Sequence, residues 1–287
     1  METLICCIGK NENKYINEYV HHYKNLGVTN ICLYDNNSIG GERFEDVIQK
    51  EIDEGYVLYH NLRGLSKCQP DIYSNCYEEY GSKYDWILFI DCDEYLELVN
   101  HSSISDFLSE ERFNNFNVIH LNMLNYGDNN QLLYEDKPLK ERFPIPLDLD
   151  HFNTYEFPDN YHVKSIVRGK ITLEEKKLIW FNSHTPVNNL PTCDGYGIQT
   201  LSGSPFLPYN YSVAYFKHYL FKSTEEFCNK LIRGYPDQIM TEEKYTEMVN
   251  NYFKVNGFSE EKRELMNEKL KEINISIENI QENKQKD

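Results

Sequence analysis

The segment from Trp86 to Tyr95 constrains this chain more than any other, because an apolar run of strand length ends in two carboxylates. A continuous run such as Trp-Ile-Leu-Phe-Ile is typical of a fully buried parallel strand. Asp91 and Asp93 follow it, and side chains at i and i+2 of an extended backbone point the same way. Because ligands bind beyond the carboxyl ends of strands in open α/β sheets, we expect both carboxylates to face a ligand.

Two converging carboxylates repel each other unless a cation joins them, and hard divalent cations prefer oxygen ligands. The pattern therefore predicts an Asp-X-Asp site that holds Mg²⁺ or Mn²⁺ against the phosphates of a nucleotide. The alternative is a strand followed by a solvated acidic turn. The pattern is short, so on its own it favours the acidic turn, and other segments have to decide.

Charge and cysteine content limit the class of protein. The net charge of −17 argues against a general nucleic-acid binder, which would carry a basic face. The eight cysteines form no CxxC pair and no zinc-ligand spacing, which is typical of a reducing compartment. The apolar segment near residue 5 is too short for a signal peptide or a membrane span, and no other stretch is longer. We therefore expect a soluble, cytoplasmic protein without a membrane span.

The first half of the chain alternates between strand and helix patterns. Helical spacing of apolar residues occurs at 14–26, 42–52 and 70–81, and the intervening strand-like runs lie at 4–8, 31–34, 56–59, 86–90 and 118–124. Such alternation predicts parallel βαβ units with right-handed crossovers. The expected fold class is α/β, with a mostly parallel, Rossmann-like central sheet flanked by helices.

The second half is different, because beyond about residue 127 the segments are short, proline is frequent and periodicity is lost until 224–234. We interpret it as a loop-rich region packed on the same sheet, where substrate-contacting loops usually lie. The predicted division is one domain over 1–235, comprising a nucleotide-binding half (about 1–125) and an acceptor-side half (about 126–235). A helical tail over 236–287 follows.

The tail carries an apolar stripe at alternating spacings of four and three residues, formed by Met266, Leu270, Ile273, Ile277 and Ile280. Two heptads are too few to define a coiled coil. We expect the stripe to pack on the domain, and a homodimer through this helix is the alternative. Residues 281–287 are expected to be disordered.

Three predicted loops meet at the carboxyl edge of the sheet: 9–12, 35–38 and 91–94. The first two suit a base and ribose, since Asp35 could accept a hydrogen bond from a ring N–H such as uracil N3. Backbone groups of Ile8 and Gly9 could flank the base. The alternative for 35–38 is a turn that tolerates left-handed conformations.

These segments resemble glycosyltransferases of the GT-A fold, in particular the family 92-like group and its relatives in the larger family 2 clan. The resemblance begins with Cys6–Glu12, Leu33–Ser38 and Asp85–Leu96. It continues in order through Asn125–Gly127, Glu141–Phe143, Lys164–Arg168, Ser183–Pro186, His218–Ser223, Glu225–Phe227, Lys230, Arg233 and Gly234. Residues 187–212 and those after 235 match nothing in this group.

The resemblance implies transfer of a sugar from a nucleotide-sugar donor, preferably UDP-linked, to a glycan or other hydroxyl acceptor, in glycan or surface polysaccharide synthesis. The nucleotide contacts expected from it are Ile8, Gly9, Lys10, Asn11, Glu12, Asp35, Asn37, Asp91, Lys164 and Arg168. For Lys164 and Arg168, structural ion pairing is an equal alternative.

The matching segment near the C-terminal end has a chemical logic of its own. His218 could be a third metal ligand beside Asp91 and Asp93, and histidine suits Mn²⁺ better than Mg²⁺. Lys222, four residues later, could supply a cation for the leaving diphosphate. The alternative for His218 is a core histidine with satisfied hydrogen bonds.

Members of the resembled group invert the anomeric centre, which requires a carboxylate base near the acceptor oxygen. The candidates are Glu141, Asp194 and Asp128, and Glu141 could instead pair internally with Arg142. Two other classes of protein stay open. A sugar nucleotidyltransferase normally carries a glycine-rich phosphate loop, which residues 9–13 lack. A non-catalytic nucleotide-sugar or carbohydrate-binding protein would not need both the Asp-X-Asp and the His–Lys elements.

Overall fold

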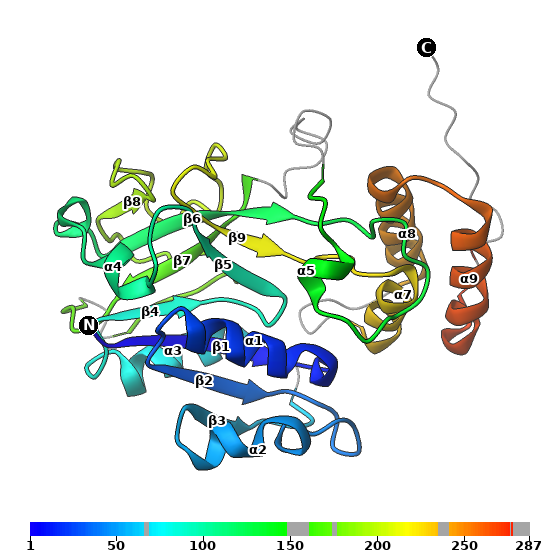
Figure 1. Ribbon diagram of the computed structural model, residues 1–287, viewed down its shortest axis with the longest axis horizontal. Coiled ribbons are helices and arrows are strands. Elements are labelled where there is room, and N and C mark those ends of the chain that lie inside the picture. Colours follow the sequence, from blue (N-terminus) through cyan, green and yellow to red (C-terminus); the bar gives the residue numbers. More distant parts are fainter. Residues whose placement is uncertain (66–68, 148–160, 174–176, 235–240, 276, 278–287) are drawn as a thin grey trace. The chain divides into compact units, whose positions relative to one another are not determined.

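The computed structural model describes residues 1–65, 69–147, 161–173, 177–234, 241–275 and 277. The chain divides into two compact units, which we describe separately (Figure 1). Unit 1 comprises Met1–Leu124 and Asn153–His218, and unit 2 comprises Asn125–Phe152 and Tyr219–Asp287.

The first part of unit 1 is a parallel sheet in the order β3-β2-β1-β4. Its strands are β1 (Thr3–Gly9), β2 (Asn30–Asp35), β3 (Val57–Asn61) and β4 (Trp86–Phe89), connected by helices α1 (Asn13–Asn25), α2 (Glu45–Asp53) and α3 (Gln69–Tyr80). This regular alternation of strand and helix confirms the predicted α/β class.

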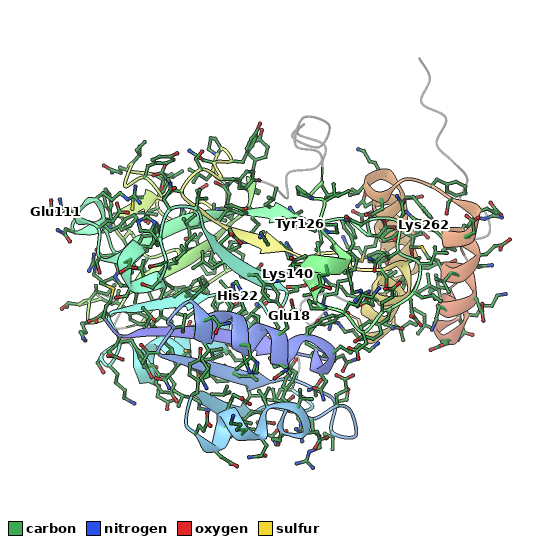
Figure 2. The ribbon with its side chains drawn as sticks, in the orientation of Figure 1. Glu18, His22, Glu111, Tyr126, Lys140 and Lys262 are labelled. Atoms are coloured by element: carbon green, nitrogen blue, oxygen red, sulfur yellow. The ribbon has the colours of Figure 1, made fainter. Side chains whose placement is uncertain are left out.

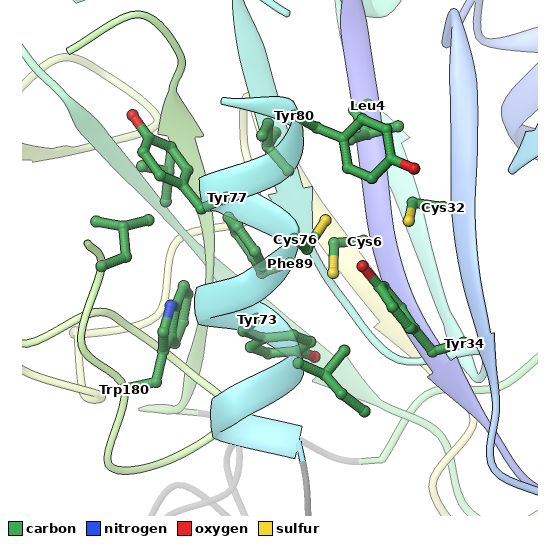
Figure 3. Close-up of a cluster of buried hydrophobic side chains, with 14 of the residues drawn as sticks. Leu4, Cys6, Cys32, Tyr34, Tyr73, Cys76, Tyr77, Tyr80, Phe89 and Trp180 are labelled. Atoms are coloured by element: carbon green, nitrogen blue, oxygen red, sulfur yellow. The ribbon is translucent and has the colours of Figure 1, made fainter. Parts of the chain in front are cut away.

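Helices α1 and α3 cover opposite faces of this sheet. Successive side chains of β1 point to opposite sides, so they pack against one helix and then the other. Cys6 packs with Tyr73 and Cys76 of α3, as Figure 3 shows. Cys7, on the other face, contacts Tyr19 of α1. Burial raises the pKa of the Cys6 thiol to about 12, so this thiol stays protonated and packs as a small apolar group.

The sheet continues beyond β4 with strands of mixed direction. These are β5 (Glu94–Leu98), β6 (Val118–Asn125), β7 (Val163–Arg168), β8 (Thr192–Asp194) and β9 (Ala214–His218), with helix α4 (Ile104–Leu108) and the 3-10 helix η1 (Glu111–Phe113) between β5 and β6. Strand β7 runs antiparallel between β4 and β6, β5 pairs antiparallel with β9, and β8 pairs parallel with β6. The region that we expected to be loop-rich therefore adds β7, β8 and β9 to the sheet. Of these, β8 and β9 are short and are not continuous apolar runs, so the sequence did not reveal them.

Unit 2 is helical, with α5 (Leu139–Arg142), α7 (Thr224–Arg233), α8 (Glu242–Asn256), α9 (Glu260–Leu270) and the 3-10 helix η3 (Lys271–Ile273). Helix α7 begins with a capping box, in which the Ser223 and Glu226 side chains each bond the other's backbone N–H. Helix α9 packs on α7, where Lys269 Nζ lies 3.0 Å from Glu225 Oε1.

The predicted boundary at residue 235 does not coincide with a boundary between the units, because α8 and α9 belong to the same unit as α7. Met266 and Leu270 of the apolar stripe are buried inside unit 2, as expected for a stripe that packs on the rest of the chain. Ile280 and residues 281–287 lie outside the described residues. Among the helices that the structure describes, none is both long enough and apolar enough to cross a membrane.

Candidate functional site

Asp91 lies just beyond the carboxyl end of β4, and both of its carboxylate oxygens are engaged. Oδ2 accepts a hydrogen bond from Lys164 Nζ at 2.6 Å, and Oδ1 accepts one from Gln69 Nε2 at 2.8 Å. Lys164 reaches this point because β7 runs antiparallel to β4, with Ser165 opposite Phe89. The side chain of Asp91 is still 31% exposed, so one part of it faces solvent.

Lys164 also binds Glu94, and both of these side chains are only 1% exposed. Lys164 Nζ lies 3.3 Å from Glu94 Oε1, and Glu94 Oε2 accepts a hydrogen bond from the backbone N–H of Asp91 at 3.0 Å. This pair holds the turn that carries the Asp-X-Asp pattern. We assigned no role to Glu94 from the sequence, although a third acidic residue directly after Asp93 indicated that it belongs to the same site.

The charges of this cluster change the pKa of its buried members. Burial raises the pKa of Glu94 to about 8; Lys164 opposes this rise, and the carboxylates of Asp91 and Asp93 add to it. Burial alone would lower the pKa of Lys164, but Asp91 and Glu94 outweigh it and hold that pKa above its ordinary value. Lys164 is therefore the resident cation of a cluster with more carboxylates than lysines.

Asp93 and His218 meet because β5 and β9 pair with Glu94 opposite His218. His218 Nε2 lies 3.7 Å from Asp93 Oδ1. Ligand atoms of Asp93, Glu94 and His218 all lie within 4.8 Å of one another. Within the described ranges, no other group of three or more His, Cys, Asp or Glu side chains is as compact.

Two carboxylates and an imidazole are donors that fit a divalent cation, and the nitrogen favours Mn²⁺ over Mg²⁺. This donor set differs from the predicted one in a single member. Glu94 stands where we expected Asp91, whose carboxylate bonds Lys164 and Gln69 and is not part of this group. Lys164 belongs to a strand that is distant in sequence, so the local pattern around Asp91 could not predict their contact.

The predicted hydrogen bond between the nucleotide base and Asp35 has to be revised. The carboxylate is fully buried and accepts hydrogen bonds from Tyr59 Oη at 2.6 Å and Arg63 Nε at 2.8 Å. It also accepts one from the backbone N–H of Asn37 at 2.9 Å. A ring N–H could reach Asp35 only if one of these side chains moved. Tyr59 and Arg63 carried no signal in the sequence.

The remaining predicted nucleotide contacts lie at the adjacent carboxyl ends of β1 and β2. The backbone N–H of Asn11 donates to Asn37 Oδ1 at 2.7 Å, which ties the two loops together. Gly9 is required here, because a Cβ atom would lie 2.7 Å from the ring of Phe44. Ile8 and Lys10 are partly exposed and Glu12 is buried. These loops form a connected edge beside the cluster of Asp91.

Arg168 lies at the far end of β7 from Lys164, opposite Trp86 in the neighbouring strand β4. Its guanidinium donates to the carbonyl oxygens of Phe116 at 2.9 Å and Phe113 at 2.7 Å, and it covers the Trp86 ring. These contacts hold the Arg168 side chain within the fold, so it has a structural role that does not depend on a nucleotide.

The three candidate bases have different surroundings. Asp194 ends β8 and accepts hydrogen bonds from the backbone N–H groups of Tyr196 and Ile198, so it shapes a turn. Glu141, in α5 of unit 2, is exposed, while its neighbour Arg142 pairs with Glu226. Glu141 and Asp194 therefore remain candidates for the catalytic base.

Asp128 is corrected from a candidate base to a structural residue. In unit 2 its Oδ2 binds Tyr252 Oη at 2.5 Å and Lys262 Nζ at 2.6 Å, and all three side chains are buried. Lys262 belongs to α9 and is labelled in Figure 2. Because a lysine and a tyrosine hold this carboxylate inside the unit, it fastens α8 and α9 and is not available to an acceptor. Lys222 also lies in unit 2, where its side chain is buried and its backbone φ is +58°.

The buried histidine His120 predicts how the stability of the fold depends on pH. It lies in β6 with Nε2 2.8 Å from Thr185 Oγ1, and burial lowers its pKa from 6.5 to about 4. Between these values the unfolded chain binds a proton that the folded chain does not, so stability falls as pH falls through this window. We expect His120→Gln to lose less stability than the parent chain between pH 7 and pH 5, as measured by urea denaturation. Equal losses would contradict this assignment.

Comparison with known proteins identifies a family. The model of glycosyltransferase family 92 matches residues 2–273. A glycosyltransferase family 92 protein of Ricinus communis is 26% identical over 120 residues, which cover 42% of this chain and 21% of that protein. One of Arabidopsis thaliana is 28% identical over 106 residues, which cover 36% and 17%. The matched segments therefore span about one fifth of these relatives.

Among solved structures, the crystal structure of S. aureus TarS 1–349 is similar with a TM-score of 0.40 and 12% identity, covering 94% of this chain and 71% of that one. The same protein in complex with UDP-GlcNAc has a TM-score of 0.41 and 12% identity, with 94% and 72% covered.

Proposed function

Because this chain belongs to glycosyltransferase family 92, we propose that it transfers a sugar from a nucleotide-sugar donor to an acceptor hydroxyl. The observation that carries the proposal is the cluster at the carboxyl end of β4, where Asp93, Glu94 and His218 converge beside the Lys164–Asp91 pair. A strand followed by a solvated acidic turn would not need a fully buried lysine to neutralise it. The family and this cluster together favour the transferase over the acidic turn.

We propose that Asp93 and His218 hold a divalent cation, Mn²⁺ or Mg²⁺, with Glu94 beside them. When bound, such a cation stabilises the negative charge that grows on a departing nucleoside diphosphate. Lys164 has a different role, because it neutralises Asp91, binds Glu94 and so keeps the Asp-X-Asp turn in place. Asp91 is left with an exposed edge that a ribose hydroxyl could approach.

We propose UDP as the nucleotide, bound along the loops that follow β1 and β2. Backbone groups of Ile8 and Gly9 would flank the base. Asp35 would act through Tyr59 and Arg63, which it holds in place. Transfer with inversion would require a carboxylate base, for which we propose Asp194 among the candidates of unit 1. Glycan or surface polysaccharide synthesis, in the cytoplasm, is the proposed setting.

The decisive assay offers the chain a panel of UDP-, GDP- and dTDP-sugars with Mn²⁺ and follows release of the nucleoside diphosphate. We expect release from a UDP-sugar, and we expect a chelator to stop it. Tight binding without any release would favour the non-catalytic nucleotide-sugar-binding protein. Pyrophosphate-dependent formation of a nucleoside triphosphate would favour the sugar nucleotidyltransferase.

A further inference from the structure

Three aromatic rings form a continuous stack on unit 1. The ring centroids of His184 and His162 lie 4.4 Å apart with an interplanar angle of 10°. Those of His162 and Phe206 lie 4.7 Å apart with an angle of 25°. We call Phe206, His162 and His184 the aromatic stack. Phe206 is its outer ring and is 49% exposed.

The stack is held by backbone bonds between segments that are distant in sequence. His162 and Phe206 face each other across an antiparallel bridge. On either side of it, Val163 N donates to Pro205 O at 3.0 Å and Leu207 N donates to Tyr161 O at 2.8 Å. His184 Nδ1 lies 3.0 Å from the carbonyl oxygen of Val163. The exposed ring of Phe206 is therefore presented by a fixed support.

The stack lies next to the candidate site, on the side away from the nucleotide loops. His162 precedes Lys164 by two residues in extended chain, so both side chains point to the same face of β7. In the sheet, β7 and β1 lie on opposite sides of β4. A nucleoside bound at β1 and β2 would thus leave the stack on the far side of Asp91, where the sugar-bearing end of a donor meets its acceptor.

The chemistry of the stack matches a sugar ring. The open face of an aromatic ring packs on the C–H groups of a pyranose, while nearby polar atoms bind its hydroxyls. Because a carbonyl oxygen can only accept, His184 must donate through Nδ1, which fixes the orientation of the innermost ring of the stack. Burial lowers the pKa of His184 to about 2, and Lys164, His162 and His218 lower it further, so this ring is neutral at ordinary pH.

We propose that the aromatic stack binds a pyranose ring of the acceptor glycan, with Phe206 as the stacking face. The inference rests on the proposed glycosyltransferase function and gives that function an acceptor class. It assigns binding, not chemistry, to these residues.

The test is saturation-transfer NMR on the full chain with UDP and Mg²⁺ present, because Mg²⁺ is diamagnetic and leaves the probe signals sharp. The probes are the methyl pyranosides of glucose, galactose, mannose and N-acetylglucosamine. We expect at least one to bind, and we expect Phe206→Ala to raise its Kd about tenfold, which corresponds to about 1.4 kcal/mol. Phe206→Tyr should retain binding, because it keeps the aromatic face.

Phe181→Ala is the matched control, since Phe181 is 79% exposed in the same unit but lies outside the stack. It should bind the pyranoside as the parent chain does, and calorimetry should show the same UDP affinity for every variant. The proposal is overturned if Phe206→Ala binds like the parent, if no pyranoside binds, or if Phe206→Ala weakens UDP binding equally. If the chain binds a pyranoside through Phe206 but binds no UDP, the proposed function is wrong. The assignment of the aromatic stack as a sugar-binding surface would then still hold.

Discussion

Asp93→Asn is expected to remove the metal-dependent part of nucleotide binding while leaving the fold intact. Asp93 supplies a carboxylate to the most compact group of ligand atoms among the described residues. An amide keeps its shape but loses its charge. Changes to residues around a metal commonly cost about 10–100-fold in metal affinity, and replacing a direct ligand should cost at least as much. Calorimetric titration of UDP with and without Mn²⁺ measures this effect.

Asp53→Asn is the matched control, because Asp53 is an exposed aspartate of α2 that bonds only to Gln49 among the contacts described. It should leave the Mn²⁺-dependent affinity for UDP unchanged. Undiminished Mn²⁺-dependent binding by Asp93→Asn would remove Asp93 from the metal site. A large loss in both variants would point to net charge as the cause.

Lys164→Met is expected to destabilise the fold strongly. The substitution removes the buried cation that binds Asp91 and Glu94. It leaves the Asp91 carboxylate without its counter-charge, while Glu94, whose pKa is raised to about 8, loses a buried hydrogen-bond partner. Breaking a buried ion pair from one side typically costs about 3–5 kcal/mol of unfolding free energy. Urea denaturation at pH 7 should show a loss of that order.

Lys170→Met provides the comparison, since Lys170 pairs with Asp85 at 2.7 Å on the surface. An exposed pair is worth about 0–1 kcal/mol, so this variant should stay close to the parent chain. Adding Asp91→Asn to Lys164→Met should recover part of the loss, because the stranded charge of Asp91 is then gone. Equal stability of Lys164→Met and Lys170→Met would contradict the role given to Lys164.

Features that depend on local sequence were predictable. The strand that precedes Asp91 and the alternation of helices and strands before it follow from apolar runs and helical spacing, which are properties of short windows. The proximity of His218 to Asp93 was expected from the order of motifs in a resembled family, not from physics. Strands β8 and β9 were missed, because they are short and, unlike the four-residue β4, neither is a continuous apolar run.

Features that depend on pairing between distant segments were not predictable. Asp35 looked like an open acceptor because nothing near it in sequence shows that Tyr59 and Arg63 would bind its carboxylate. Asp128 looked like a candidate base until Lys262 and Tyr252 enclosed it. In both cases a polar residue in a loop was assigned to a ligand, whereas the folded chain supplies the partner itself.

The central claim is that the carboxyl end of β4 holds a metal-bound nucleoside diphosphate, and a crystal structure with Mn²⁺ and UDP tests it most directly. Anomalous scattering locates the manganese without assumptions about its ligands. We predict a metal peak about 2.0–2.6 Å from an Asp93 carboxylate oxygen and from His218 Nε2, in contact with the diphosphate. A manganese peak elsewhere, or UDP bound away from β4 with Asp93 and His218 free of metal, would contradict the account.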